Sequence, residues 1–473
     1  MTTSQLEPTA ANVPLTGAEV YPGEDEAQLG RSLKSRHVAM IAIGGIIGAG
    51  LFVGSSSAIA MTGPAVVLSY AIAGLLVMLV MRMLSEMAAA IPGVQSFPEF
   101  ARVGLGHWAG FLSGWLYWYF WVVVVAIEAI AGAVILQLWI PLPVWALGVL
   151  LMALLTVVNL LSTRSYGEFE FWFSSLKVAA IVAFILISGA YATGLISAGG
   201  PSFANLTAHS GFMPKGPLSV LAGVTTVIFS LVGAEIATIA AAESAEPAKT
   251  IARMTGSVAL RILFFYILSI FLIVSVVPWT EIKPGVSPFA VALSRMDIPG
   301  AATIMNLIVL VAVLSCLNSG LYVTSRVLFG LAAKGDAPQA LVALNGRKVP
   351  VRAILVASLF SYAALAASVL SPEVVFSFLV NASGALMLII YLMLAFSQIK
   401  LRRQLEAETP ERLVIRMWLF PGLSYATVAG ILLVLAAMAL TSELTSQLYS
   451  SLIITGLFLI VFALFRRGKQ ALR

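Results

Sequence analysis

The stretch Ile43–Phe52, with the sequence IGGIIGAGLF, concentrates four glycines within seven residues of an apolar segment. The segment runs from about Val38 to Met61 and is long enough to span a lipid bilayer. Each glycine costs roughly 1 kcal/mol against alanine in a helix interior. The cluster therefore predicts one of two structures: close packing of helices through small residues, or a deliberate break in a membrane-spanning helix.

A helix break inside a membrane has a definite chemical consequence. One half-helix presents N–H groups that attract a carboxylate, and the other presents carbonyl groups that attract an ammonium group or a cation. An amino acid carries both charged groups. A second candidate break lies in Phe229–Ile236, where Gly233 interrupts another apolar segment and Glu235 follows two residues later.

The composition identifies the class of protein. The chain has 473 residues, of which 60% are hydrophobic and 10% charged, and its mean hydropathy is +1.00. Repeated apolar segments of this kind predict an all-α polytopic membrane protein. The net charge of +6 arises from basic residues in loops, so we expect no nucleic-acid partner. Residues 1–32 are polar and unpatterned, and we interpret them as a disordered cytoplasmic tail.

Hydropathy predicts twelve spans, with both termini on the same side of the membrane. Three of the 27 basic residues (Lys215, Lys283 and Arg295) fall outside, if the N-terminus is inside. This asymmetry follows the positive-inside rule and predicts cytoplasmic termini. The predicted spans are Val38–Met61, Pro64–Ala90, Trp108–Trp139, Val144–Ser162, Glu168–Leu195, Leu218–Ala242, Val258–Trp279, Ala301–Ala333, Ala353–Leu370, Glu373–Ile399, Trp418–Leu440 and Gln447–Phe465.

Three ionisable residues lie inside predicted spans: Glu128, Lys177 and Glu235. An ionisable group at this depth costs at least about 2.5 kcal/mol, which makes each a candidate for function. Lys177 either exchanges a proton or extends its amino group to the cytoplasmic surface. Glu128 either pairs with Lys177, accepts a proton, or is a protonated acid that bonds to a neighbouring backbone group.

Other function classes find little support in the sequence. The three histidines lie in loops or at span ends, and the chain has no metal-ligand spacing, P-loop or nucleophile elbow. We therefore expect no enzyme activity, metal or cofactor. Pore loops typical of channels are not evident either. Interrupted spans one and six are five spans apart, which indicates a transporter built of two inverted five-span repeats.

From Leu33 to about Phe465 the chain resembles the amino acid–polyamine–organocation superfamily, and within it the bacterial amino acid transporter family. The segments Leu33–Val38 and Gly233–Ser244 and the run Ser315–Ser319 read like the γ-aminobutyrate (GABA) permease subgroup. The other segments that carry the resemblance are Ile43–Ser55, Tyr166–Trp172, Gly211–Pro214, Ser325–Leu331 and Gly335–Pro338.

The resemblance implies the LeuT-like fold, with a ten-helix core over residues 33–400 and two peripheral helices with a cytoplasmic tail in 401–473. The inverted repeats would cover 38–195 and 218–399. The resemblance further implies that the substrate carboxylate meets N–H groups of Gly48, Ala49 and Gly50. The ammonium group would meet carbonyls of Ile46, Phe229 and Val232, with the Phe229 ring as a gate over the substrate.

The resemblance also assigns the coupling residues and the activity. Lys177 matches a lysine thought to replace the sodium ion of related transporters, and Glu235 matches an acid linked to coupling or substrate binding. Glu128 completes the proton-coupling candidates. We expect a proton symporter that takes up a small amino acid, first γ-aminobutyrate, across a bacterial inner membrane. Its alternatives are a permease for proline or another neutral amino acid, and an obligate amino acid exchanger.

Overall fold

The computed structural model describes residues 47–91, 94, 96–161, 166–197, 199–233, 235, 262–346 and 349–471. Every regular element within these ranges is a helix, as the hydropathy pattern predicts. The helices share one large core of buried apolar side chains. In a membrane, helices satisfy their own backbone hydrogen bonds, which is why an apolar chain adopts them.

The described part of the glycine-rich stretch, in η1, contacts α2 and α9 of the first half and α13 and α16 of the second. The structure begins with a π-helical turn that continues into a short α-helix and then into a long returning helix. These elements are η1 (Gly50–Gly54), α2 (Ser55–Thr62), η2 (Gly63–Ala65), α3 (Val66–Ala90), α4 (Glu99–Leu105), α5 (His107–Leu136), α6 (Val144–Leu161), α7 (Tyr166–Ala192), α8 (Asn205–Ala208) and α9 (Gly216–Leu231).

The second half contains the longest helices of the described chain. Its elements are η3 (Ile262–Leu268), α12 (Ser269–Val276), η4 (Trp279–Glu281), α13 (Pro288–Arg295), α14 (Ala301–Ala333), η5 (Gln339–Val342), α15 (Val351–Ala366), η6 (Ala367–Val369), α16 (Pro372–Glu408), η7 (Pro410–Arg412), α17 (Gly422–Leu440) and α18 (Thr445–Ala471).

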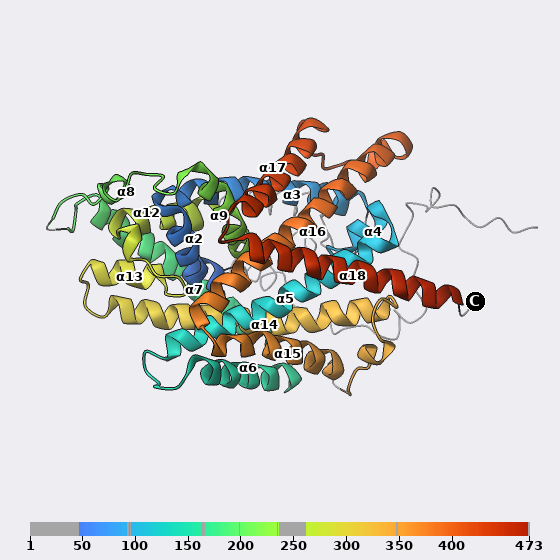
Figure 1. The fold of residues 1–473 in the computed structure, drawn as a ribbon, viewed down its shortest axis with the longest axis horizontal. Coiled ribbons are helices and arrows are strands. Elements are labelled where there is room, and N and C mark those ends of the chain that lie inside the picture. The colour runs from blue at the N-terminus through green and yellow to red at the C-terminus, as the bar shows by residue number, and fades with distance from the viewer. Residues whose placement is uncertain are drawn as a thin grey trace, which may run out of the picture.

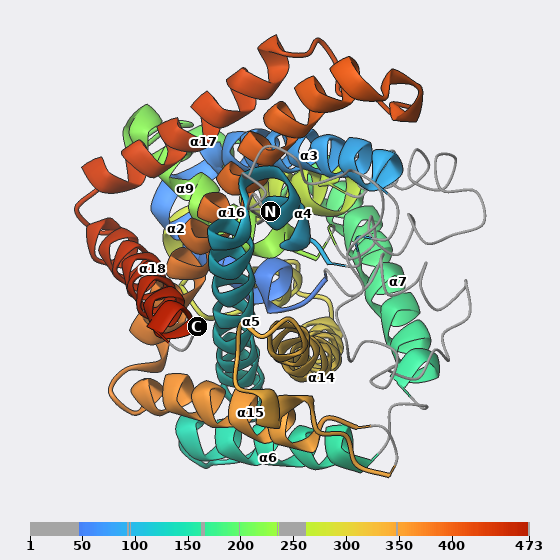
Figure 2. The ribbon, with the colours of Figure 1, turned by 90° about the vertical axis from the view of Figure 1, so that its right-hand side faces the viewer.

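Helix α5 runs through the middle of the bundle. It packs against α14, α16, α6 and α15, which lie around it in Figures 1 and 2. Helix α9 packs against α2, α3, α16 and α17, and α7 packs against α12 and α14. In the end-on view of Figure 2, α17 and α18 lie on the outside of α16.

Eight helices in the described residues are long and apolar enough to cross a membrane, and three further apolar helices are shorter. The predicted span Ala301–Ala333 coincides with α14, and helices overlap the ranges of the other predicted spans. The eight spans establish a multi-pass membrane protein, while the count of twelve and the inverted repeat remain predictions. Helix α16 continues without interruption to Glu408, so the division predicted at residues 400 and 401 falls inside a helix.

The interruption predicted in the sixth span is present. Helix α9 ends at Leu231, Val232 is extended with ψ 149°, and Gly233 has φ 108°. That backbone conformation is readily available to glycine alone, because a Cβ would collide with the neighbouring backbone. Glu235 is helical again. The rest of the predicted span, residues 236–242, lies outside the described residues.

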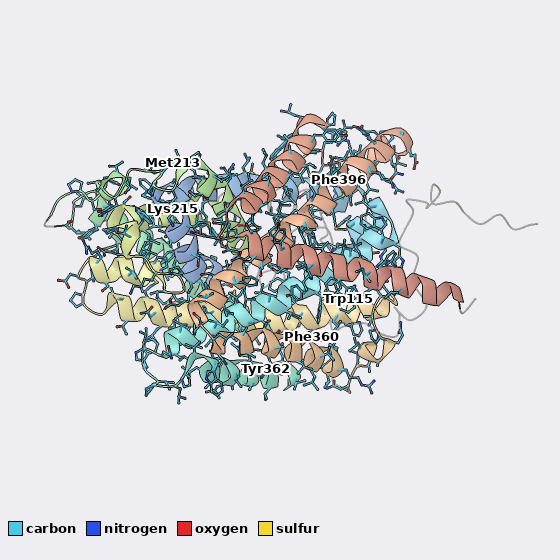
Figure 3. The ribbon with its side chains drawn as sticks, in the orientation of Figure 1. Trp115, Met213, Lys215, Phe360, Tyr362 and Phe396 are labelled. Atoms are coloured by element: carbon cyan, nitrogen blue, oxygen red, sulfur yellow. The ribbon has the colours of Figure 1, made fainter. Side chains whose placement is uncertain are left out.

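The first span is described from Ile47 onward, so residues 38–46 of its predicted range, with Ile46, lie outside the described part. Ile47 and Gly48 are not helical, and helix begins at Ala49 and Gly50. At the opposite end of the bundle from the C-terminal end of α18, Figure 3 shows Met213 and Lys215 beside one another. Which side of the membrane each end faces stays a prediction.

Candidate functional site

The site begins where the start of η1 meets the end of α9. A Cβ on Gly50 would lie 2.7 Å from the Ser230 Cα and 3.3 Å from a ring carbon of Phe229. Only glycine permits the two backbones to approach this closely. The contact brings the start of one helix beside the last turn of another, and the first N–H groups and last carbonyl groups of helices have no partner within the helix. This is the arrangement that can hold a zwitterion.

Glu128 on α5 points at the start of the first helix. Its two carboxyl oxygens each lie 3.1 Å from the Ala49 N–H, which donates to them. The side chain is buried, with 2% exposure. The sequence left three interpretations of Glu128 open. The structure shows the hydrogen bond to a backbone group, that of Ala49, which one of them required. An electrostatic interaction with Lys177 accompanies it.

Lys177 on α7 is fully buried, so its amino group does not extend to the surface. The Nζ donates to the Ser315 hydroxyl on α14 at 2.9 Å. The next residue on α14, Cys316, has its Sγ 3.6 Å from the Ile47 carbonyl oxygen. Through the neighbouring residue on α14, Lys177 is therefore linked to Ile47, which lies two residues before the Ala49 that Glu128 contacts.

Glu235 forms a second cluster after the break in the sixth span. Its side chain is fully buried. One carboxyl oxygen accepts from the Tyr117 hydroxyl at 3.1 Å, and the other accepts from the Gly233 N–H at 2.9 Å. Tyr117 and Glu128 are eleven residues apart on α5, about 16 Å along the axis of an ideal helix. The two acids thus lie at different heights of the bundle.

Aromatic rings line the space between these clusters. Phe229 lies 6.4 Å from Phe120, measured between ring centroids. Tyr117 contacts Phe97 edge-on at 5.2 Å, and Phe97 in turn contacts Tyr391 at 6.3 Å. Phe229 is 6% exposed, so it is covered on nearly all sides in this conformation.

The structure places the predicted residues in two groups. Gly48, Ala49 and Gly50 lie beside Glu128 and Phe229. Glu235 bonds to Tyr117 and to the Gly233 N–H, and Val232 stands at the end of α9 just before this break. The run Ser315–Ser319 contributes to the family resemblance, but the sequence assigned Ser315 and Cys316 no role in the site, and it did not single out Tyr391. Tyr117 lies in a run of aromatic residues. Such residues more often anchor a helix at the membrane interface than line a substrate path, so the sequence did not single it out.

Known proteins resemble this chain over nearly its whole length. The amino acid permease family matches residues 37–471. The γ-aminobutyric acid permease of Bacillus subtilis is 48% identical over 448 residues, which cover 94% of this chain and 96% of the relative. The γ-aminobutyric acid permease of Escherichia coli is 46% identical, with coverage of 87% and 89%. The aromatic amino acid transport protein AroP of Corynebacterium glutamicum is 38% identical, with coverage of 92% and 94%.

The fold is also that of solved transporters. The manganese transporter of Eremococcus coleocola, in a variant form, superposes with a TM-score of 0.55 at 16% identity, covering 93% of this chain and 97% of the other. Identity at this level shows the fold alone, which the chain shares with that structure over nearly its whole length. The match of the family model to residues 37–471 and the 48% identity to the Bacillus subtilis relative show that the chain belongs to the amino acid permease family.

Proposed function

We propose that the protein is a secondary transporter that couples the uptake of γ-aminobutyrate to the entry of protons. Two relatives that are 46–48% identical over most of their length carry the name of γ-aminobutyric acid permeases, which supports the choice of substrate. The close contact of the two helix ends at Gly50 is the observation that carries the transport site.

The two ends of the substrate bind to backbone groups in this proposal. The carboxylate meets the N–H groups of Gly48, Ala49 and Gly50, because the first N–H groups of a helix have no partner within it. The ammonium group meets the carbonyls of Phe229 and Val232, together with that of Ile46. The last carbonyls of α9 lack a partner within the helix, since Val232 is extended and Gly233 turns the chain away.

Three buried ionisable groups serve as candidates for proton coupling. Lys177, Glu128 and Glu235 are each almost fully covered by the bundle. A buried charge is costly unless it is compensated, so a change of protonation shifts the balance between conformations of the surrounding helices. Lys177 joins α7 to α14 through Ser315, and Glu128 joins α5 to the first helix, so both bridge elements that must move apart in alternating access.

Uptake into proteoliposomes tests this proposal. We expect labelled γ-aminobutyrate to accumulate under an inward proton gradient, and we expect a gradient-collapsing agent or Lys177→Ala to abolish accumulation. Proline and alanine serve as parallel substrates. Accumulation of proline or alanine instead would keep the mechanism and change the substrate. Transport seen only in preloaded liposomes would identify an obligate exchanger and contradict proton-driven uptake.

A further inference from the structure

The position of Glu128 has a consequence for how substrate binds. Both of its carboxyl oxygens lie at hydrogen-bonding distance from one N–H group, that of Ala49. This N–H belongs to the first residues of a helix that continues through η1 and α2 to Thr62. The carboxyl group of Glu128 thus occupies this position in the structure, so the position accommodates a carboxyl group.

The surroundings of this N–H group leave little space for a second carboxylate. A Cβ on the preceding residue, Gly48, would lie 2.8 Å from the Glu128 Oε1 and 2.4 Å from the Cys316 Sγ. Both distances are shorter than a van der Waals contact, so the side chains of Glu128 and Cys316 already fill the space beside Gly48. A substrate carboxylate can reach the Ala49 N–H only if the Glu128 carboxyl moves away.

Charge adds to this steric conflict. Hydrogen bonds to an ionised acceptor are roughly twice as strong as those to a neutral one. Two carboxylates at one N–H would also repel each other strongly in a site that excludes water. Protonation of Glu128 removes the repulsion and weakens its bond to Ala49. Among the described residues, Lys177 interacts electrostatically with Glu128, and its ammonium group has no lone pair with which to accept the Ala49 N–H.

We infer that Glu128 is an internal competitor of the substrate carboxylate at the Ala49 N–H, and that protonation of Glu128 releases this N–H for substrate. The inference rests on the proposed function and adds a reason for coupling: the site cannot accept substrate until it has accepted a proton. The order of events is proton first, then the substrate carboxylate.

The inference predicts how affinity depends on pH. Between about pH 5.5 and 9 neither a carboxylate with an ordinary pKa near 4 nor an alkyl ammonium near 10 changes its charge, so γ-aminobutyrate itself does not titrate. Within that range the Kd of the wild type should rise with pH, by up to about tenfold per pH unit where Glu128 is mostly ionised.

Two variants test the inference on purified protein by equilibrium binding of labelled γ-aminobutyrate. Glu128→Gln keeps the shape but not the charge, so we expect the low-pH affinity of the wild type at every pH. Glu128→Asp keeps an ionisable group but is shorter by one methylene, about 1.5 Å, so it withdraws from Ala49. We expect a clearly weaker pH dependence than in the wild type.

The results distinguish this inference from the proposed function. If the Kd of Glu128→Gln rose with pH as steeply as that of the wild type, another group would set the pH dependence, and the inference would be overturned. If the Kd of Glu128→Asp depended on pH as steeply as that of the wild type, contact with the Ala49 N–H would not be required. That result would also overturn the inference. A wild type that neither binds nor exchanges γ-aminobutyrate, proline or alanine would overturn the proposed function first.

Discussion

Asp336, just after α14, shows how much of the packing depends on single charged residues. Its side chain is fully buried and accepts from Arg102 on α4, while it shares a 2.8 Å hydrogen bond with the His107 Nε2. Burial by itself opposes ionisation of this carboxyl. The hydrogen bond with His107 and the charge of Arg102 outweigh burial, so the pKa of Asp336 lies below its ordinary value of 3.8.

The lowered pKa of Asp336 predicts how the loss of stability in Asp336→Asn depends on pH. Asp336→Asn keeps the size but loses the charge, and at pH 7 we expect it to lower stability by roughly 2 kcal/mol, the scale of a hydrogen bond to a charged group. The folded pKa is below the unfolded one, so this stabilisation is complete above about pH 4 and disappears as the pH falls through the folded pKa.

Thermal unfolding of the purified protein in detergent, followed over a range of pH, measures this difference. The wild type should be more stable than Asp336→Asn at neutral pH, and this difference in stability should disappear only in acid. A difference in stability that had already vanished at neutral pH would contradict the assignment to the Asp336 carboxylate.

At the scale of elements, the two helix ends that meet at the site depend on glycine. Gly50 and Gly54 both belong to η1, yet their surroundings differ. A Cβ at Gly50 would collide with the backbone at Ser230, whereas the nearest atom to a Cβ at Gly54 is 3.4 Å away. The backbone atoms of a helix cannot yield as the end of a flexible side chain can.

This difference predicts unequal effects of the same substitution. Gly50→Ala should separate η1 from α9 and reduce the transport rate at least about tenfold, because a displacement near 1 Å is enough to cost two orders of magnitude at a positioned site. Gly54→Ala gains the same helix propensity without the collision, so its rate should stay within about twofold of the wild type.

Initial rates in proteoliposomes, normalised to the amount of inserted protein, compare the two variants. Equal losses in both would mean that flexibility of η1, and not its close approach to α9, explains the glycines.

At the scale of the whole molecule, a buried polar network joins the outer helices to the bundle. Glu86 on α3 pairs with Arg402 on α16. The amide of Gln398 donates to the Glu86 carboxylate at 2.7 Å, and Ser424 on α17 donates to Gln398 at 3.0 Å. Arg402 also lies over the Phe420 ring at 5.2 Å. The network thereby fixes α3, α16 and α17 to one another.

Removing one member of the buried pair should destabilise the fold. Arg402→Met leaves the Glu86 carboxylate buried without its partner charge, at a cost of roughly 3–5 kcal/mol. Arg403→Met is the matched control on the same helix. Arg403 is exposed and contacts only the Tyr425 hydroxyl among the hydrogen bonds of the described residues. Its loss should cost well under 1 kcal/mol.

The unfolding midpoint in detergent measures both variants under identical conditions. A lowering of several degrees is expected for Arg402→Met and little change for Arg403→Met. Midpoints that fell equally would show that the helix surface, and not the buried pair, is the source of stability.

Much of the architecture follows from local pattern. Runs of apolar residues predict helices because a bilayer leaves the backbone no other partners, and α14 matches its predicted bounds residue for residue. The break in the sixth span was visible as Gly233 within an apolar run, because glycine reaches φ 108° without strain. The extension of α16 to Glu408 was missed, since hydropathy falls at Lys400 while helix propensity does not.

The sequence by itself determined the membrane class, the positions of most helices, the break before Glu235 and the three buried ionisable residues. Each of these depends on composition and spacing along one segment. Only the tertiary structure decided the partners: Glu128 at the Ala49 N–H, Lys177 at Ser315, and Tyr117 at Glu235. Such contacts join residues between 79 and 138 positions apart, and no local pattern specifies them, because the packing of whole helices sets which side chains meet.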